Sequence, residues 1–375
     1  MFVLSVLGGA LGAPFGLGFL GSPIAAIELP AEKVAPAIDF GLFEYEVKNS
    51  AIMFWIAGVI LTLVAFFGTR KIRSNSPEKD VPTGLQNFLE VIVDFFIKLA
   101  ESAAGGRHGR RFLPLVLSIF LVVVVNNWIS VLPGVGTIGW VETSTEFAEH
   151  REHAIEEAEL DHSEPDFKDP DLVVFNDGPI KIIPFGRTSQ DAVPLASLEL
   201  DAEGHGVELH DRDLLDEDFD EGLLADIDSH DVDLSEDVGI LVPYLRGANT
   251  DVNNTLAIAI VAMITVQIWG FRSLGFSGYG GKFINIKQGP ILFFVGILEI
   301  IGELARTISF TFRLFGNMFA GEVLLVAMMF LFPLIGIIPF IGLELFVGVI
   351  QAFIFAMLTL VFGVMATIGH GEEEH

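Results

Sequence analysis

Six ionisable side chains lie inside the last two apolar stretches of the chain, where charge is costly. They are Glu299, Glu303, Arg306, Arg313, Glu322 and Glu344. A charged side chain at the centre of a membrane helix costs about 2.5–3.5 kcal/mol on insertion scales, so such residues usually serve an ion or proton pathway. A buried carboxylic acid can exchange a proton near neutral pH, because burial disfavours its charged form. This set of residues therefore indicates proton transfer within a membrane.

Arg313 is the deepest cation in these stretches, and phenylalanine and leucine surround it in the sequence. No acid stands three or four residues away on either side, so we expect its anionic partner on another helix or another chain. Arginine does not lose its proton in proteins and cannot itself relay one. Glu303 and Arg306 stand three residues apart, and for them a structural ion pair explains the charges as well as a functional role does.

The polar side chains around Arg313 form two sets that differ in depth. The outer set, near the turn between the last two apolar stretches, comprises Asn317, Glu322, Glu344 and Gln351, and the inner set comprises Glu299, Thr307 and Ser309. Glu322 stands nine residues after Arg313, which places it about half a turn around a helix and roughly 13 Å further along. A fixed cation between two sets of polar groups opposes the direct passage of a proton. The pattern predicts two half-paths that need a mobile proton carrier from elsewhere.

Apolar runs long enough to cross a hydrocarbon core of about 30 Å carry these residues. The runs are Ala51–Gly68, Phe112–Leu132, Leu256–Phe271, Gly289–Phe332 and Phe340–Thr367. The last two exceed a perpendicular crossing, so we expect them to be tilted or broken. We expect an all-α membrane protein of about six helices. These are four crossings, with the last two long and tilted, one interfacial helix, and a shorter helix or helical break near Gly289.

The loop between the first two runs has an amphipathic pattern over residues 85–101, which predicts a helix lying in the membrane interface. Basic clusters at Arg70–Arg73 and Arg107–Arg111 flank this loop. By the positive-inside rule the loop is cytoplasmic. The N-terminus and the segment after the second run then lie outside, and the C-terminus lies in the cytoplasm.

The net charge of −28 is concentrated in one segment, because residues 141–243 hold 31 acidic and 5 basic side chains. We therefore divide the chain into an N-terminal outer or interfacial segment (1–50), the first two crossings (51–140), an acidic insert (141–243) and the remaining crossings (244–375). The insert combines acidic stretches with short apolar runs such as Leu172–Phe175, so a small β-rich subdomain and a disordered acidic loop both fit. Residues 1–27 fit either a signal peptide without a basic start or an interfacial segment.

Four segments resemble signatures of the F-type ATP synthase subunit a family. They are Arg313–Glu322 (RLFGNMFAGE), Gln351–Phe355 (QAFIF), Asp251–Leu256 (DVNNTL) and Gly84–Asn87 (GLQN). The resemblance covers about residues 45–140 and 240–370, in order. It implies a non-catalytic subunit in a bacterial cell membrane that conducts protons, with sodium ions as the alternative. It also implies a rotor ring of small hairpin subunits and a peripheral-stalk subunit as partners, and it implies no cofactor, metal or nucleic acid.

The resemblance also implies roles for single residues. Arg313 would face a carboxylate of the rotor ring, and Glu299, with Ser309 beside it, would lie on the inner path. The outer path would be lined by Asn317, Glu322, Glu344 and Gln351. Two features depart from the family: position 344 is a histidine in some members, and the acidic insert is far longer than the usual outer loop.

Two other kinds of protein fit a charged membrane hairpin. A self-contained ion-coupled secondary transporter should show repeats and discontinuous helices, and no second copy of the Arg313 segment is present. An intramembrane scaffold with incidental ion pairs predicts that Arg313 can be lost without effect on proton flux. Co-purification with a ring of small hairpin proteins would distinguish the subunit from both.

Overall fold

The computed structural model describes residues 31, 33–39, 44–70, 84–132, 135–136, 139–144, 171–174, 193–194, 198–200, 207–209, 234, 238–283, 290–331 and 337–367. Internal contacts divide the chain into two compact units. The first, here the helical unit, comprises residues 33–135, 245–321 and 343–375. The second, here the sheet unit, comprises residues 1–32, 136–244 and 322–342.

Five helices in the described part of the chain are long and apolar enough to cross a membrane. They are α2 (Asn49–Thr69), α5 (Leu113–Ser130), α8 (Val252–Phe283), α9 (Pro290–Leu331) and α10 (Ile338–Thr367). A helix satisfies its own backbone groups, which is what a lipid surrounding requires. The chain is thus an all-α membrane protein, as predicted. Four crossings were expected, and five described helices have the length and apolarity of a spanning segment, because each of the five apolar runs forms a helix of its own.

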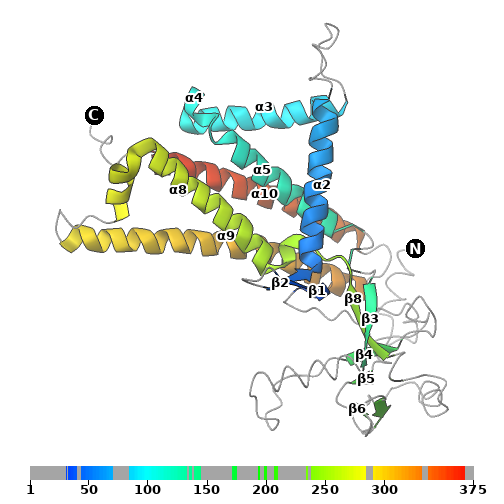
Figure 1. Cartoon of the computed structure of the whole chain (residues 1–375). Helices are drawn as coiled ribbons and strands as arrows, with labels where there is room; N and C mark the ends of the chain where they lie inside the picture. The colour runs from blue at the N-terminus through cyan, green and yellow to red at the C-terminus, as the bar shows by residue number, and fades with distance from the viewer. Residues whose placement is uncertain are drawn as a thin grey trace. The chain divides into compact units, whose positions relative to one another are not determined.

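The predicted amphipathic helix is present as α3 (Leu85–Ala104) and is followed by the short α4 (Gly106–Gly109). Figure 1 shows α3 running across the end of α2 rather than alongside it. Phe96 and Ala100 are buried, whereas Phe88 and Val91 are exposed. A helix that crosses the end of a spanning helix and carries apolar side chains outward is suited to a position in the membrane interface.

The third spanning helix is longer than the predicted Leu256–Phe271 run. α8 continues to Phe283 and contains a kink at Gly275, where φ is 74°. The part that can cross a membrane ends at this glycine, at Val252–Gly275. Beyond it, residues 276–283 turn back toward the span. The break expected near Gly289 falls on residues 284–289, which lie outside the described residues.

The core of the helical unit lies where α5, α8, α9 and α10 meet. Buried residues from all four helices form one cluster, which includes Val123, Ala259, Leu314 and Phe355. A second cluster joins α3, α5 and α10. Several of the buried residues are alanines, and small side chains let membrane helices approach closely. This packing holds α9 and α10 in register at the level of Arg313.

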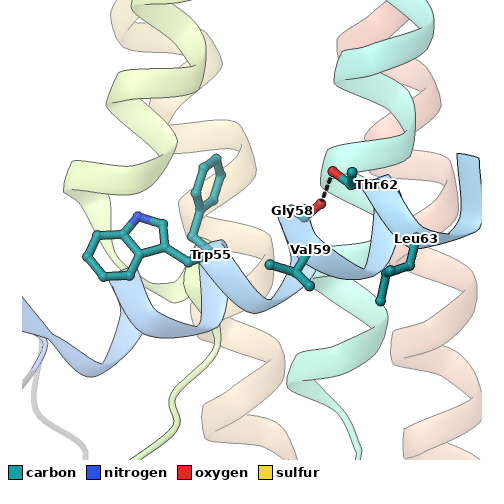
Figure 2. A pocket seen from close by; sticks show the side chains of 6 residues that line it. Trp55, Gly58, Val59, Thr62 and Leu63 are labelled. Carbon is teal, nitrogen blue, oxygen red and sulfur yellow. Dashed lines mark hydrogen bonds between the residues drawn. The ribbon is translucent and has the colours of Figure 1, made fainter. Parts of the chain in front are cut away.

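An apolar pocket of about 420 Å³ lies along α2 (Figure 2). Phe54, Trp55, Gly58, Val59, Thr62 and Leu63 line it. The Thr62 hydroxyl donates a hydrogen bond to the backbone oxygen of Gly58 at 2.8 Å. The lining of the pocket is therefore apolar, and the Thr62 hydroxyl in it already has a hydrogen-bond partner.

Strands precede α2 and form much of the described insert. β1 (Lys33–Asp39) and β2 (Glu44–Lys48) pair antiparallel just before α2. The sheet unit holds a four-stranded sheet in the order β3-β8-β4-β5 and a two-stranded sheet of β6 and β7. Its strands are β3 (Gly139–Thr143), β4 (Asp171–Val174), β5 (Val193–Pro194), β6 (Leu198–Leu200), β7 (Val207–Leu209) and β8 (Val238–Pro243). The described residues of the insert thus follow the β-rich interpretation.

The two ends of the acidic insert are neighbours in the sheet. β3 and β8 pair antiparallel, with Val141 opposite Leu241 and Thr143 opposite Gly239. The first and last described strands of the insert therefore lie side by side. Residues 1–30, the run Ile180–Phe185 and the acidic C-terminal tail lie outside the described residues.

Candidate functional site

The structure brings Arg313, Asn317 and Gln351 together between α9 and α10. The Gln351 side-chain amide donates a hydrogen bond to the backbone oxygen of Arg313 at 2.9 Å. The Asn317 amide donates to the Gln351 side-chain oxygen at 2.8 Å. Gln351 is only 3% exposed. Two amide side chains thus connect α10, by hydrogen bonds, to the turn of α9 that carries the arginine. The sequence spacing was compatible with these hydrogen bonds but did not predict them.

The Arg313 side chain is partly exposed and has no ion pair within the described part of the chain. Phe310 and Leu314 on the same turn are buried in the core, whereas Phe312 is 58% exposed. Arg313 therefore lies between the packed face of α9 and its outward face. An unpaired guanidinium at this depth needs an anion from outside the described residues.

The outward face of α9 near Arg313 combines small residues with large apolar ones such as Ile308 and Phe312. Ser309 and Ala320 are exposed. A Cβ placed on Gly302 or Gly316 would meet nothing within 4 Å. An apolar face with small residues allows another helix to approach closely.

Glu344 is buried against the backbone of α9. It is 5% exposed, and its Oε1 atom has no hydrogen-bond partner among the described residues. A Cβ on Gly321 would collide with the Glu344 carboxylate, so glycine is what lets this carboxylate fit. Glu322 is half-buried on α9, about 13 Å along the helix from Arg313 by helical rise. The shared outer cleft expected for Glu322 and Glu344 stays a prediction.

Buried amides that sequence reasoning missed extend this site toward α5 and the short helix η6 (Ala248–Thr250). Asn127 donates to the backbone oxygen of Gly348, one turn after Glu344, at 3.1 Å. Asn249 donates to the Asn127 side-chain oxygen at 2.6 Å. The Oδ1 atoms of Asn126 and Asn249 are buried without a hydrogen-bond partner among the described residues. These oxygens can each accept a bond from water, and paired asparagines in an apolar run were the available signal.

Asp251, the residue directly after η6, places a carboxylate in the same region. The Ser50 hydroxyl, at the start of α2, donates to Asp251 Oδ2 at 2.7 Å, and both residues are buried. Asp251 also accepts a bond from the backbone N–H of Asn253 at 2.9 Å. The helices α2, α5 and η6 thus contribute polar side chains to one end of the bundle. The sequence alone had placed only Asn317, Glu322, Glu344 and Gln351 in the outer set.

The inner set contains an ion pair. Arg306 donates to Glu303 Oε1 at 2.5 Å, and its guanidinium lies 5.1 Å from the centre of the Phe362 ring. The ion pair that the three-residue spacing allowed for these two charges is thus present. Ser309 is exposed and Glu299 is partly buried. The other Glu303 oxygen is buried without a hydrogen-bond partner in the described chain.

Tyr279 and Gln267 are further polar residues that the sequence did not point to. The Tyr279 hydroxyl donates to Gln267 Oε1 at 2.6 Å. Burial, and then the charges of Glu303 and Glu299, raise the pKa of Tyr279 to about 12. Tyr279 therefore stays neutral at physiological pH. Its nearness to the inner acids arises from the fold-back after Gly275, which no local pattern signals.

Comparisons with known proteins agree on one family. Residues 51–150 and 232–363 match the family described as ATP synthase A chain, and the second range contains every predicted site residue. The chain is similar to ATP synthase subunit a of Moorella thermoacetica, with 33% identity over 338 residues that cover 90% of this chain and 98% of the relative. It is similar to ATP synthase subunit a of Mycobacterium tuberculosis, with 27% identity over 329 residues covering 85% and 86%. The same name belongs to a relative from Gloeobacter violaceus, with 24% identity over 321 residues covering 86% and 82%.

Proposed function

We propose that this chain, which belongs to the ATP synthase A chain family, provides two offset half-paths for protons. The half-paths load and unload protons on a carboxylate of a rotor ring, and Arg313 separates them. As a member of this family the chain is a non-catalytic membrane subunit of an ATP synthase and works with the other subunits of that complex. The observation that carries the finer proposal is the partly exposed Arg313 with no ion pair in the described chain, held by Gln351 between two polar sets.

The outer path runs along α10 to Arg313. Glu344, Gln351 and Asn317 follow one another toward the arginine, and the last two are hydrogen-bonded. Asn127 and Asn249 extend the polar lining beyond Glu344 toward the end of the bundle. Glu322 belongs to the outer set by its place on α9. Carboxylates exchange protons, and amides with free oxygens hold the water that carries protons between them.

The inner path lies on the other side of Arg313 along α9. Glu299 and Ser309 are its polar groups, with the Glu303–Arg306 pair beside them. Because Glu303 and Arg306 neutralise each other, Glu299 is the acid best placed to exchange protons here. Ser309, one turn before Arg313, is exposed and lies nearest the outward face.

The outward face of α9 is the surface that the ring carboxylate passes. Ser309, Gly316 and Ala320 leave room for a neighbouring helix, and Phe312 lies exposed among them. A permanent positive charge at Arg313 favours the ionised form of a carboxylate that comes close, which promotes proton release. It also opposes a proton passing directly from one path to the other.

Thiol labelling in the complete complex tests the two-path arrangement. The chain contains no cysteine, so a single cysteine placed at Glu344 or at Ser309 gives a defined signal from this subunit. We expect a membrane-impermeant thiol reagent to label position 344 from the outer side and position 309 from the inner side. Labelling of both positions from one side would rule out two half-paths on opposite sides of Arg313.

A further inference from the structure

Trp128, near the end of α5, combines an exposed ring with a polar atom that is turned toward another helix. Its side chain is 45% exposed. Its indole N–H donates a hydrogen bond to the backbone oxygen of Leu345 on α10 at 3.1 Å. A tryptophan at a membrane interface can leave its N–H to water or to lipid headgroups. The N–H of Trp128 instead connects α5 to α10, across 217 residues of sequence.

The neighbouring residue of α5 makes a second bond to the same part of α10. The Asn127 amide donates to the backbone oxygen of Gly348 at 3.1 Å. A Cβ on Gly348 would lie 3.0 Å from the Asn127 Cβ, so the two helices approach closely here. Leu345 and Gly348 are three residues apart and therefore lie on one side of α10, on neighbouring turns. Two consecutive residues of α5 thus hold one stretch of α10 at two points.

The stretch of α10 that is held in this way carries Glu344. Glu344 directly precedes Leu345 and is 5% exposed. Its carboxylate occupies the space beside Gly321 on α9, where an added Cβ would collide with it. Glu344, Gly348 and Gln351 are all buried, and their spacing places them on one face of the helix. A movement of α10 against α5 would therefore move the Glu344 carboxylate against α9.

We propose that Trp128 is a positioning residue of the outer path, whose indole N–H fixes the turn of α10 that carries Glu344. The inference rests on the proposed function, because it concerns how an acid of that path is held. A proton is transferred over a hydrogen-bond distance of about 2.6–3.2 Å or through one water. A carboxylate on a loosely held turn is at that distance less often and exchanges protons more slowly. Trp128 itself carries no proton along the path, because its indole N–H is a donor only.

The test separates the N–H of Trp128 from the bulk of its ring. Trp128→Phe keeps an aromatic ring and removes the N–H, whereas Trp128→His keeps a ring N–H and removes the larger part of the ring. The initial rate of ATP-driven proton pumping is measured per assembled complex in reconstituted vesicles at pH 8, where a histidine is mostly neutral. Trp55→Phe is the matched control, since Trp55 is 53% exposed on α2 and its indole makes no hydrogen bond within the described residues.

A second measurement reports on the position of Glu344 itself. Glu344→Cys is labelled from the outer side with an impermeant thiol reagent, alone and combined with Trp128→Phe or Trp128→His. The labelling rate of Ser309→Cys from the inner side, with and without Trp128→Phe, shows whether the whole helical unit has loosened. This measurement needs no pumping, so it reads the local structure directly.

We expect the Trp128→Phe complex to pump about two- to tenfold more slowly than the wild type, the range of one lost hydrogen bond. Trp128→His should pump faster than Trp128→Phe, because it restores a donor for the Leu345 oxygen. The labelling rate at position 344 should change by about twofold or more in Trp128→Phe, and the rate at position 309 should not change. The Trp55→Phe complex should pump at the wild-type rate.

Wild-type pumping by Trp128→Phe would overturn the inference, because the N–H would then be dispensable. Trp128→His pumping more slowly than Trp128→Phe would overturn it as well, since the bulk of the ring would then be what matters. Slow pumping with unchanged labelling at position 344 would place the defect away from Glu344, and loss of assembly in Trp128→Phe would assign the bond to folding alone; either result contradicts the inference. Failure of the proposed function looks different: Glu344→Cys and Ser309→Cys would be labelled from the same side, whatever the Trp128 variants did.

Discussion

At the scale of residues, the junction between α9 and α10 depends on neutral amides as much as on charge. Gln351 donates a hydrogen bond to the backbone oxygen of Arg313 and accepts one from the side chain of Asn317. Each such bond contributes about 0.5–1.5 kcal/mol, so the pair can hold one turn of α9 in a defined position. Arg313 is thereby fixed through its backbone, while its side chain stays available for an anion from outside the described residues.

Gly321 is predicted to be required for the position of Glu344. In Gly321→Ala the new methyl group would take the place of the Glu344 carboxylate, the mobile end of that side chain, and would displace it. We expect a marked loss of ATP-driven pumping in an assembled complex, with partial recovery when Glu344→Asp shortens the side chain. The control is Gly58→Ala on α2, where an added Cβ meets nothing within 4 Å.

Normal pumping by Gly321→Ala would show that the contact between Gly321 and Glu344 does not matter to the outer path. A loss that Glu344→Asp fails to relieve would place the defect in the packing of α9 and α10 instead. Subunit content of the purified complex separates either result from a failure to assemble.

The sequence predicted Arg313 and its two sets because a charge in an apolar run is visible without a fold. Spacing put Asn317 on the helix face of Arg313, and the resemblance to a family assigned Asn317 and Gln351 to the outer path, but neither predicted the contact of Gln351 with the Arg313 backbone. The sequence did not point to Tyr279, Asn127 or Asn249, because their partners are 12, 221 and 122 residues away. Long-range contacts of single polar residues have no local pattern.

At the scale of elements, the lengths of apolar runs predicted the spanning helices well. α9 has 42 residues and α10 has 30, which exceeds the roughly 20 residues of a perpendicular crossing. The fold-back at Gly275 escaped prediction because glycine is common in this chain, with 39 residues, and a single one carries no signal. The β1–β2 pair also escaped, since Pro36 interrupts β1 and the polar–apolar alternation of β2 covers only five residues.

The orientation of these helices is predicted from charge and can be measured. Because the chain has no native cysteine, single cysteines at Asn75 and Leu160 are suitable reporters. We expect an impermeant thiol reagent to reach position 75 from the cytoplasmic side and position 160 from the outer side, since basic loops stay inside. Finding both positions on one side of the membrane would refute the topology.

At the scale of the whole molecule, the acidic insert is a separable part of the chain. Its first and last described strands, β3 and β8, are paired, so its ends already lie side by side. Its negative field can raise the local concentration of cations, an effect screened beyond about 8–10 Å at physiological salt. The membrane helices form their core without it, from residues of the helical unit.

Removal of the insert is therefore predicted to leave proton conduction largely intact. Deleting Glu146–Asp237 and closing the gap with a short linker keeps β3 and β8, whose pairing makes a hairpin connection possible. We expect ATP-driven pumping near the wild-type rate, with a weaker dependence on salt because most of the negative charge is gone. Complete loss of pumping in an assembled complex would assign the insert a direct part in conduction.

The central claim concerns Arg313 as the barrier between two half-paths. Arg313→Ala removes the only fixed charge between the two polar sets in the described part of α9 and α10. Passive proton leak should then persist or rise, while coupled transport fails. Arg313→Lys should fail as well, because an ammonium is a smaller charge that can lose its proton and lacks the planar fork. Arg272→Ala is the control, since Arg272 is exposed near the end of the α8 span.

The most direct measurement is ATP-driven proton pumping by reconstituted vesicles that contain the assembled Arg313→Ala complex, beside wild-type and Arg272→Ala complexes of equal subunit content. The account predicts pumping at the wild-type rate for Arg272→Ala and none above background for Arg313→Ala, with ATP hydrolysis no longer linked to proton movement. Near-normal pumping by the Arg313→Ala complex would contradict the account.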